Sequence, residues 1–172
     1  QSRERVEPAY RALPDVVAAV MDEFGARTGR AYRPFEYVGA PDADRVLVLM
    51  GSAADTADET VAWAQDRGEK VGAVKVRLFR PFDTRRFLEA IPPTARVVAV
   101  LDRTKEPGSV GEPLLQDVQS ALHEDVFATS PRFERTPRAI GVRYGLSSKE
   151  LTPAMLTGLF AEMADEAPRP RL

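Results

Sequence analysis

Short apolar runs alternate with amphipathic stretches along most of the chain. Residues 45–50, 71–79 and 96–102 are rich in Val, Leu and Ala, and each run is too short for a helix. After each run comes a turn-forming or polar segment, and then a stretch in which apolar residues recur every three or four positions. The pattern therefore predicts three buried strands, each followed by a helix.

The predicted helices begin at capping signals. Ser52, with Asp55 three residues later, has capping-box spacing for the helix that follows the first strand. Thr84 can cap the next, short helix, and the pair Thr152-Pro153 is typical of the start of a last helix. The apolar residues expected to face the core from these helices are Ala57, Val61, Ala64, Leu114, Leu115, Val118, Leu122, Met155, Leu156, Leu159, Phe160 and Met163.

This alternation favours a three-layer α/β/α fold around a mostly parallel sheet. Parallel neighbours need crossover connections, and the predicted helices supply them. Residues 138–143 form a short fourth strand in this interpretation, and residues 32–38 are extended or loop. The fold class is therefore α/β.

The chain divides into three parts on this interpretation. Residues 1–30 are predicted to be an N-terminal helix and a linker from a preceding domain, residues 31–164 the α/β domain, and residues 165–172 a linker or a frayed tail. Since the sequence starts with Gln and not Met, we expect an excerpt of a longer polypeptide. The N-terminal helix is predicted to follow Pro14, from the helical spacing of Val16, Val17, Val20, Met21 and Phe24.

Composition narrows the classes of function. The 172 residues suffice for one domain of about 150 residues, and 44% hydrophobic with 29% charged residues is typical of a folded protein. A net charge of −2 gives no positive field for nucleic acid or anionic lipid. No apolar run approaches the roughly 18 residues of a membrane helix, so we expect a cytoplasmic protein without a membrane partner. The absence of cysteine excludes thiolate metal sites in this chain.

The carboxyl ends of the predicted strands are where a parallel sheet usually binds ligands. A glycine-containing, polar stretch follows the third strand, and a Gly-Ser pair follows the first. Flexible backbone and nearby cations suit an anion, and they suit a surface that docks onto another domain equally well. The candidate residues for interdomain or anion contact are Gly51, Ser52, Arg103, Lys105, Glu106, Gly108, Gly111 and Glu112.

No catalytic or metal-ligating residue is predicted. Ser52 lacks the Gly-x-Ser-x-Gly nucleophile elbow, and the single His123 leaves no partner for a triad or a metal. Asp102, at the end of the third strand, is predicted to close a turn or to pair with a neighbouring Arg, and not to act as a general acid or base. The residues alone therefore predict an α/β domain whose loops bind an anion or a neighbouring domain.

Five stretches, in one order, resemble pyruvate:ferredoxin (flavodoxin) oxidoreductases. The similarity runs from about residue 30 to residue 160, and it resembles the second domain of that family, which is similar to the C-terminal domain of transketolase. The string Leu-Asp-Arg-Thr-Lys-Glu-Pro-Gly carries much of the resemblance. The five stretches are residues 32–44, 48–52, 74–82, 101–114 and 143–155.

The resemblance implies a parent enzyme that oxidatively decarboxylates pyruvate on thiamine diphosphate and magnesium. Such enzymes pass electrons through iron–sulfur clusters to ferredoxin or flavodoxin, deliver the acetyl group to coenzyme A, and associate as homodimers. The chain has neither the Gly-Asp-Gly start of a thiamine diphosphate motif nor a cysteine, so the family's catalytic residues have no positions here.

A non-catalytic structural role is therefore what the resemblance implies for this chain. The isolated domain is expected to be inactive and to hold no cofactor, and its partners are the other domains or subunits of the parent. Two alternatives stay open. One is a module that binds coenzyme A or a nucleotide, and the other is the equivalent domain of a different thiamine-dependent 2-oxoacid oxidoreductase or of a transketolase.

Overall fold

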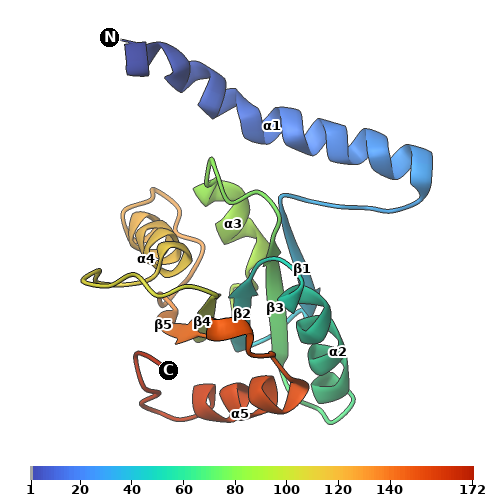
Figure 1. Ribbon diagram of the computed structural model, residues 1–172, viewed down its shortest axis with the longest axis vertical. Coiled ribbons are helices and arrows are strands. Elements are labelled where there is room, and N and C mark those ends of the chain that lie inside the picture. Colours follow the sequence, from blue (N-terminus) through green and yellow to red (C-terminus); the bar gives the residue numbers. More distant parts are fainter. Residues whose placement is uncertain (1) are drawn as a thin grey trace.

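A five-stranded sheet lies at the centre of the computed structural model, which describes residues 2–172 (Figure 1). Four neighbouring strands are parallel, and one edge strand is antiparallel. This arrangement confirms the predicted α/β class and its mostly parallel sheet. The strands, in spatial order, are β1 (Phe35–Gly39), β3 (Val71–Val76), β2 (Arg45–Leu49), β4 (Val97–Asp102) and β5 (Arg138–Arg143).

Helices cover both faces of the sheet and make the middle of it inaccessible to water. The helices are α2 (Ala53–Gln65), α3 (Thr84–Ala90), α4 (Pro113–Val126) and α5 (Pro153–Met163), with a 3₁₀ turn η1 (Leu146–Ser148) after β5. Between the sheet and α3 and α4, strand residues such as Val48 and Val74 pack with Leu114 of α4, and on the other face Leu47 packs with Leu156 of α5. Burial on both faces explains the apolar runs of the strands.

The predicted core faces of the helices are confirmed with one exception. Ala57, Val61 and Ala64 of α2 are buried against the sheet, as their spacing indicated. Met155 was expected in the apolar stripe of α5, but it is 56% exposed. It lies in the first turn of α5, where the stripe begins only with Leu156.

Two of the three predicted caps are wrong. Ser52 makes no capping hydrogen bond, because its own backbone is already helical and its side chain is not directed at the first amides of α2. At α3, Asp83 and not Thr84 is the cap, and its carboxylate accepts the Arg86 amide hydrogen at an N···O distance of 3.0 Å. Thr152 caps α5 as predicted.

The last residues of the chain lie along the open edge of β5. Gly141 N donates to Pro170 O at 3.0 Å, and Leu172 N donates back to Gly141 O at 2.9 Å. The tail thus satisfies backbone groups that an edge strand would leave to solvent. The end of the tail therefore pairs with β5, while the division of the chain, with residues 165–172 as a linker or a frayed tail, stays a prediction.

The helix α1 (Ser2–Thr28) lies apart from the three layers, above α3 in Figure 1. It begins well before Pro14, where the sequence pattern placed its start, and it contains both Pro8 and Pro14. An ion pair of 2.6 Å between Asp15 and Arg86 joins it to α3.

Candidate docking site at the strand ends

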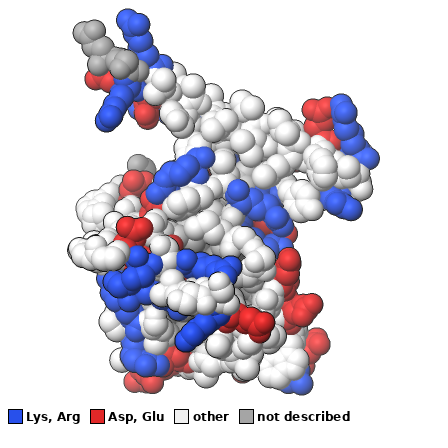
Figure 2. Space-filling model, in the orientation of Figure 1, with Lys and Arg blue, Asp and Glu red and all other residues white. Residues whose placement is uncertain are grey.

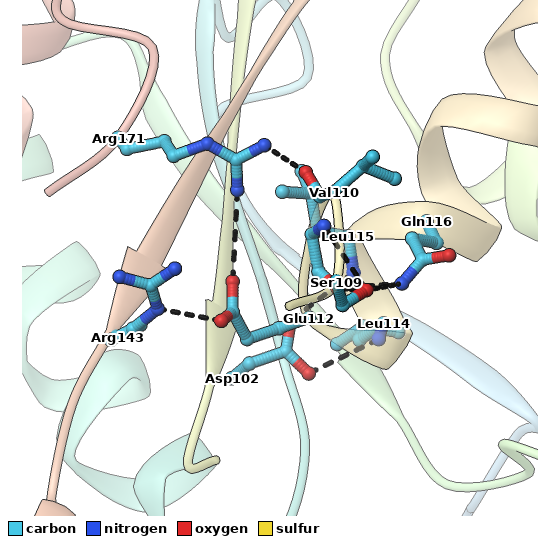
Figure 3. Close-up of polar contacts among 10 residues, drawn as sticks. Asp102, Ser109, Val110, Glu112, Leu114, Leu115, Gln116, Arg143 and Arg171 are labelled. Atoms are coloured by element: carbon cyan, nitrogen blue, oxygen red, sulfur yellow. Dashed lines mark hydrogen bonds and ion pairs between the residues drawn. The ribbon is translucent and has the colours of Figure 1, made fainter. Parts of the chain in front are cut away.

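Asp102 ties the end of β4 to the first turn of α4. Its side chain is buried, and its two carboxylate oxygens accept the amide hydrogens of Leu114 and Leu115, each at 3.1 Å (Figure 3). A carboxylate suits this place because a helix begins with unpaired amides and a partial positive charge. Burial raises the pKa of Asp102 above its ordinary value, and the two backbone donors only partly offset this. Asp102 therefore fixes both ends of the loop at residues 103–112, a role the sequence did not reveal.

Glu112 connects the end of this loop to β5 and to the chain's tail. Its buried carboxylate accepts a hydrogen bond from Arg143 Nε at 2.6 Å, and Arg171 lies 3.8 Å from its second oxygen (Figure 3). The Arg143 guanidinium holds the pKa of Glu112 below its ordinary value, although burial acts in the opposite direction. Glu112 is thus an internal anchor and does not offer its charge to a partner.

The second half of the loop is held by its own polar groups. Ser109 Oγ donates to Gly111 O at 2.7 Å, and Gln116 Nε2 donates to the same carbonyl at 2.6 Å and to Ser109 Oγ at 2.9 Å. The Arg171 guanidinium donates to Val110 O. The base of the loop is therefore fixed in place from α4 and from the tail.

The tip of the loop, in contrast, faces solvent. Lys105, Glu106 and Gly108 are exposed, and Val110 is 79% exposed. The Lys105 ammonium has no ion-pair partner among residues 2–172. Arg103 Nε donates a hydrogen bond to Gly145 O at 3.2 Å. A firmly held base that presents cations and an apolar side chain is typical of a surface that contacts another protein surface.

Comparison with known proteins shows where this architecture occurs. The family model "pyruvate:ferredoxin oxidoreductase core domain II" matches residues 43–142, which is more than half of the chain. The chain belongs to the pyruvate:ferredoxin oxidoreductase family. The resemblance noted in the sequence is thereby confirmed, and the segment corresponds to domain II of this family.

Curated relatives of the oxidoreductase family match almost the whole chain. A pyruvate-flavodoxin oxidoreductase of Nostoc sp. is 52% identical over 98% of the chain, and a probable pyruvate-flavodoxin oxidoreductase of Escherichia coli is 53% identical over 99%. A pyruvate:ferredoxin oxidoreductase of Moorella thermoacetica is 48% identical over 98%. The chain spans only 14% of the length of each of these three relatives.

A solved oxidoreductase structure has the same fold. The 2-oxoglutarate:ferredoxin oxidoreductase from Magnetococcus marinus, solved with 2-oxoglutarate, coenzyme A and succinyl-CoA bound, matches with a TM-score of 0.54. It is 18% identical, and the match covers 78% of this chain and 20% of that one. At this identity the likeness shows the fold of the oxidoreductase domain and nothing more.

The predicted site residues of this oxidoreductase domain do not all come together. The structure brings Arg103 through Glu112 into one loop, but no hydrogen bond or ion pair within residues 2–172 links that loop to Gly51 or Ser52, which lie exposed after β2. Arg143 was expected at the end of the fourth strand, but its pairing with Glu112 was not predicted; it follows because β5 lies parallel to β4. Sequence reasoning missed Arg171, which no local signal marks.

The side chains of this domain offer no site for a metal ion or an iron–sulfur cluster within the described residues. The described part of the chain contains no group of three or more His, Cys, Asp or Glu side chains that could hold a metal ion. The sequence has no cysteine for an iron–sulfur cluster. These side chains therefore do not fit a metal or cluster site. Within the same residues, no helix is long and apolar enough to cross a membrane.

The Glu112–Arg143 pair gives the oxidoreductase domain a pH-dependent contribution to stability. Because the folded-state pKa of Glu112 lies below the ordinary 4.5, the contribution is present above that pH and is lost as the pH falls through the lowered pKa. We expect Glu112→Gln to be less stable than the parent chain at pH 7, by a difference that shrinks below about pH 4. Urea unfolding at a series of pH values measures this difference, and one that is constant with pH would contradict the assignment.

Proposed function

We propose that this chain is a non-catalytic structural domain of a pyruvate:ferredoxin or pyruvate:flavodoxin oxidoreductase. The observation that carries the proposal is the loop at residues 103–112, whose fixed base presents an exposed, charged tip. In this proposal the tip docks onto the other domains or subunits of the enzyme. The names of the curated relatives support the assignment to pyruvate oxidation with ferredoxin or flavodoxin as electron acceptor.

The complete enzyme, in this proposal, is a cytoplasmic homodimer that converts pyruvate and coenzyme A to acetyl-CoA. In this proposal thiamine diphosphate, magnesium and the iron–sulfur clusters belong to its other domains, since the described residues of this chain hold no cluster of metal-ligating side chains and the sequence has no cysteine. A domain without catalytic groups still affects turnover, since a misplacement of about 1 Å at a reacting centre can cost on the order of a hundredfold in rate.

Alanine substitution of the two loop cations tests the docking role. In the complete oxidoreductase, we expect the double variant Arg103→Ala, Lys105→Ala to weaken assembly by up to about thirtyfold, since two exposed charges at up to about 1 kcal/mol each contribute up to about 2 kcal/mol. Subunit and domain association is followed by analytical ultracentrifugation and limited proteolysis, and turnover with pyruvate is measured beside it. Lys70→Ala is the control, because Lys70 precedes β3 and so lies at the opposite edge of the sheet. A double variant that assembles and turns over like the control would overturn the docking role.

The alternative of an anion-binding module is weakened by the geometry of α4. A phosphate at a helix N-terminus needs free backbone amides. Here the amides of Leu114 and Leu115 already donate to Asp102. Calorimetry with coenzyme A discriminates the two hypotheses, because heat that saturates at micromolar ligand and disappears in Lys105→Ala would favour the binding module.

A further inference from the structure

The apolar residues of α1 follow a regular spacing. Val6, Tyr10, Leu13, Val17, Val20 and Phe24 are separated by alternating steps of four and three residues. An average step of 3.5 residues keeps side chains in one narrow line along a helix, and that line is the pattern by which one helix packs against another. We call these six side chains the α1 seam.

Most of the α1 seam is exposed within the described chain, although the ring of Phe24 stacks on that of Tyr32 with centroids 5.8 Å apart. Val6, Tyr10, Val20 and Phe24, together with the adjacent Val16, are between 41% and 59% exposed. Figure 2 shows the middle of α1 as an uncharged stretch between two charged ends. Single exposed apolar residues are ordinary, but a contiguous line of them marks a surface that another element covers.

The contacts between α1 and the three layers lie on a different side of the helix. Pro14 is buried, and Ala18 and Asp22 line a hollow of about 400 Å³ that is shared with the start of β1 and with α3. Asp15 reaches Arg86 from the same region. The body of the domain therefore holds α1 in position while it leaves the seam open.

The length of the relatives indicates which segment packs against the α1 seam. They match this chain over nearly its whole length, yet it spans only 14% of theirs, so most of each relative lies outside the segment seen here. A segment of the same assembly is present at a high effective concentration, which favours it over a second, free copy of the domain.

We propose that the α1 seam is the docking face for an apolar helix from the part of the oxidoreductase outside residues 1–172. This inference rests on the proposed function, because it needs a larger enzyme around the domain. It is independent of the loop at residues 103–112, since α1 and that loop are separate surfaces. The seam would give the domain a second, apolar attachment beside the charged one.

Photocrosslinking in the complete oxidoreductase tests the proposal directly. The photoreactive amino acid p-benzoyl-phenylalanine is placed at Val20, and in a control at Ala19, which is exposed on the other side of α1. We expect position 20 to crosslink to one helical segment outside residues 1–172, identified by mass spectrometry, and position 19 to give no such product. Equal products from both positions, or none from position 20, would overturn the proposal, and a crosslink between two copies of α1 would assign the seam to self-association instead.

A pair of charge substitutions gives a second, independent measurement. Val20→Glu places a carboxylate in the seam, and we expect it to lower the yield of assembled enzyme by about tenfold or more, because a buried unpaired charge is strongly unfavourable. Ala19→Glu adds the same charge outside the seam and should leave assembly unchanged. If the Arg103 and Lys105 variant disturbs assembly while Val20→Glu does not, the inference fails and the proposed function stands; if neither does, both fail.

Discussion

Asp102→Ala is expected to lower the free energy of unfolding of this chain by about 3 kcal/mol or more. The substitution removes two hydrogen bonds to a buried carboxylate, and bonds of this kind contribute about 1.5–3 kcal/mol each. It also leaves the amides of Leu114 and Leu115 without partners under the protein surface. Urea unfolding followed by circular dichroism measures the loss.

Two further variants separate this role of Asp102 from ordinary helix capping. Thr152→Ala removes the exposed cap of α5 and should cost about 1 kcal/mol. Asp102→Asn keeps one carbonyl oxygen, and so one of the two bonds, and should cost about half as much as Asp102→Ala. A loss for Asp102→Ala no larger than that for Thr152→Ala would contradict the assignment of Asp102 as the link between β4 and α4.

The Asp102 contacts also matter for the proposed docking. Since the carboxylate fixes the first residue before the loop to the first turn after it, its loss frees both ends of residues 103–112 at once. In the complete enzyme we expect Asp102→Ala, at a temperature where the domain stays folded, to weaken assembly in the same direction as the variant of Arg103 and Lys105. Asp102 would then support docking by holding Arg103 and Lys105 in the position from which they contact the rest of the enzyme.

The sequence predicted the layers of the fold well because burial leaves a strong local pattern. The apolar runs of β2, β3 and β4 are short and continuous, and the faces of α2 and α4 have helical spacing. The caps were predicted less well. Ser52 and Thr84 have the right residue types, but which neighbour captures the first amides depends on the backbone angles at that turn, as Asp83 shows.

The anchors of the candidate site could not be predicted from local pattern, because each one joins distant segments. Asp102 bonds to amides that lie beyond a loop, and Arg171 reaches the loop from the end of the chain. The sequence identified the loop itself, since glycine, proline and charge gather there. It did not show that Glu112 is an internal anchor, while Lys105 has no ion-pair partner within residues 2–172.

Lys75 is a charged residue in the buried strand β3, and its burial was not predicted. It is 6% exposed, and its ammonium lies 2.8 Å from Asp58 of α2 and 2.6 Å from Glu36 of β1. Burial acts to lower the pKa of Lys75, but the two carboxylates outweigh it and the pKa lies above its ordinary value. The cation therefore holds α2 and the edge strand β1 to the sheet.

We expect Lys75→Met to lower the free energy of unfolding at pH 7 by about 3 kcal/mol, near the lower end of the cost of breaking a buried ion pair. Methionine keeps much of the side-chain volume but leaves Asp58 without its cation, while Glu36 keeps only its pair with Arg77 at 3.0 Å. Urea unfolding measures the loss. Lys70→Met is the matched control, because its pair with Asp42 is exposed, and exposed pairs contribute little. Equal losses in the two variants would show that the network around Lys75 is no stronger than a surface pair.

The pH dependence of the same variant tests the cause of the loss. The pKa of Glu36 lies below its ordinary value of 4.5, so its contribution to stability is present above that pH and disappears as the pH falls through the lowered pKa. Once Glu36 is protonated, the loss of the Lys75 cation no longer removes an ion pair from it. We therefore expect the difference between Lys75→Met and the parent chain to shrink in acid. A difference that persists unchanged at about pH 3 would assign the loss to packing of the lysine stem and not to charge.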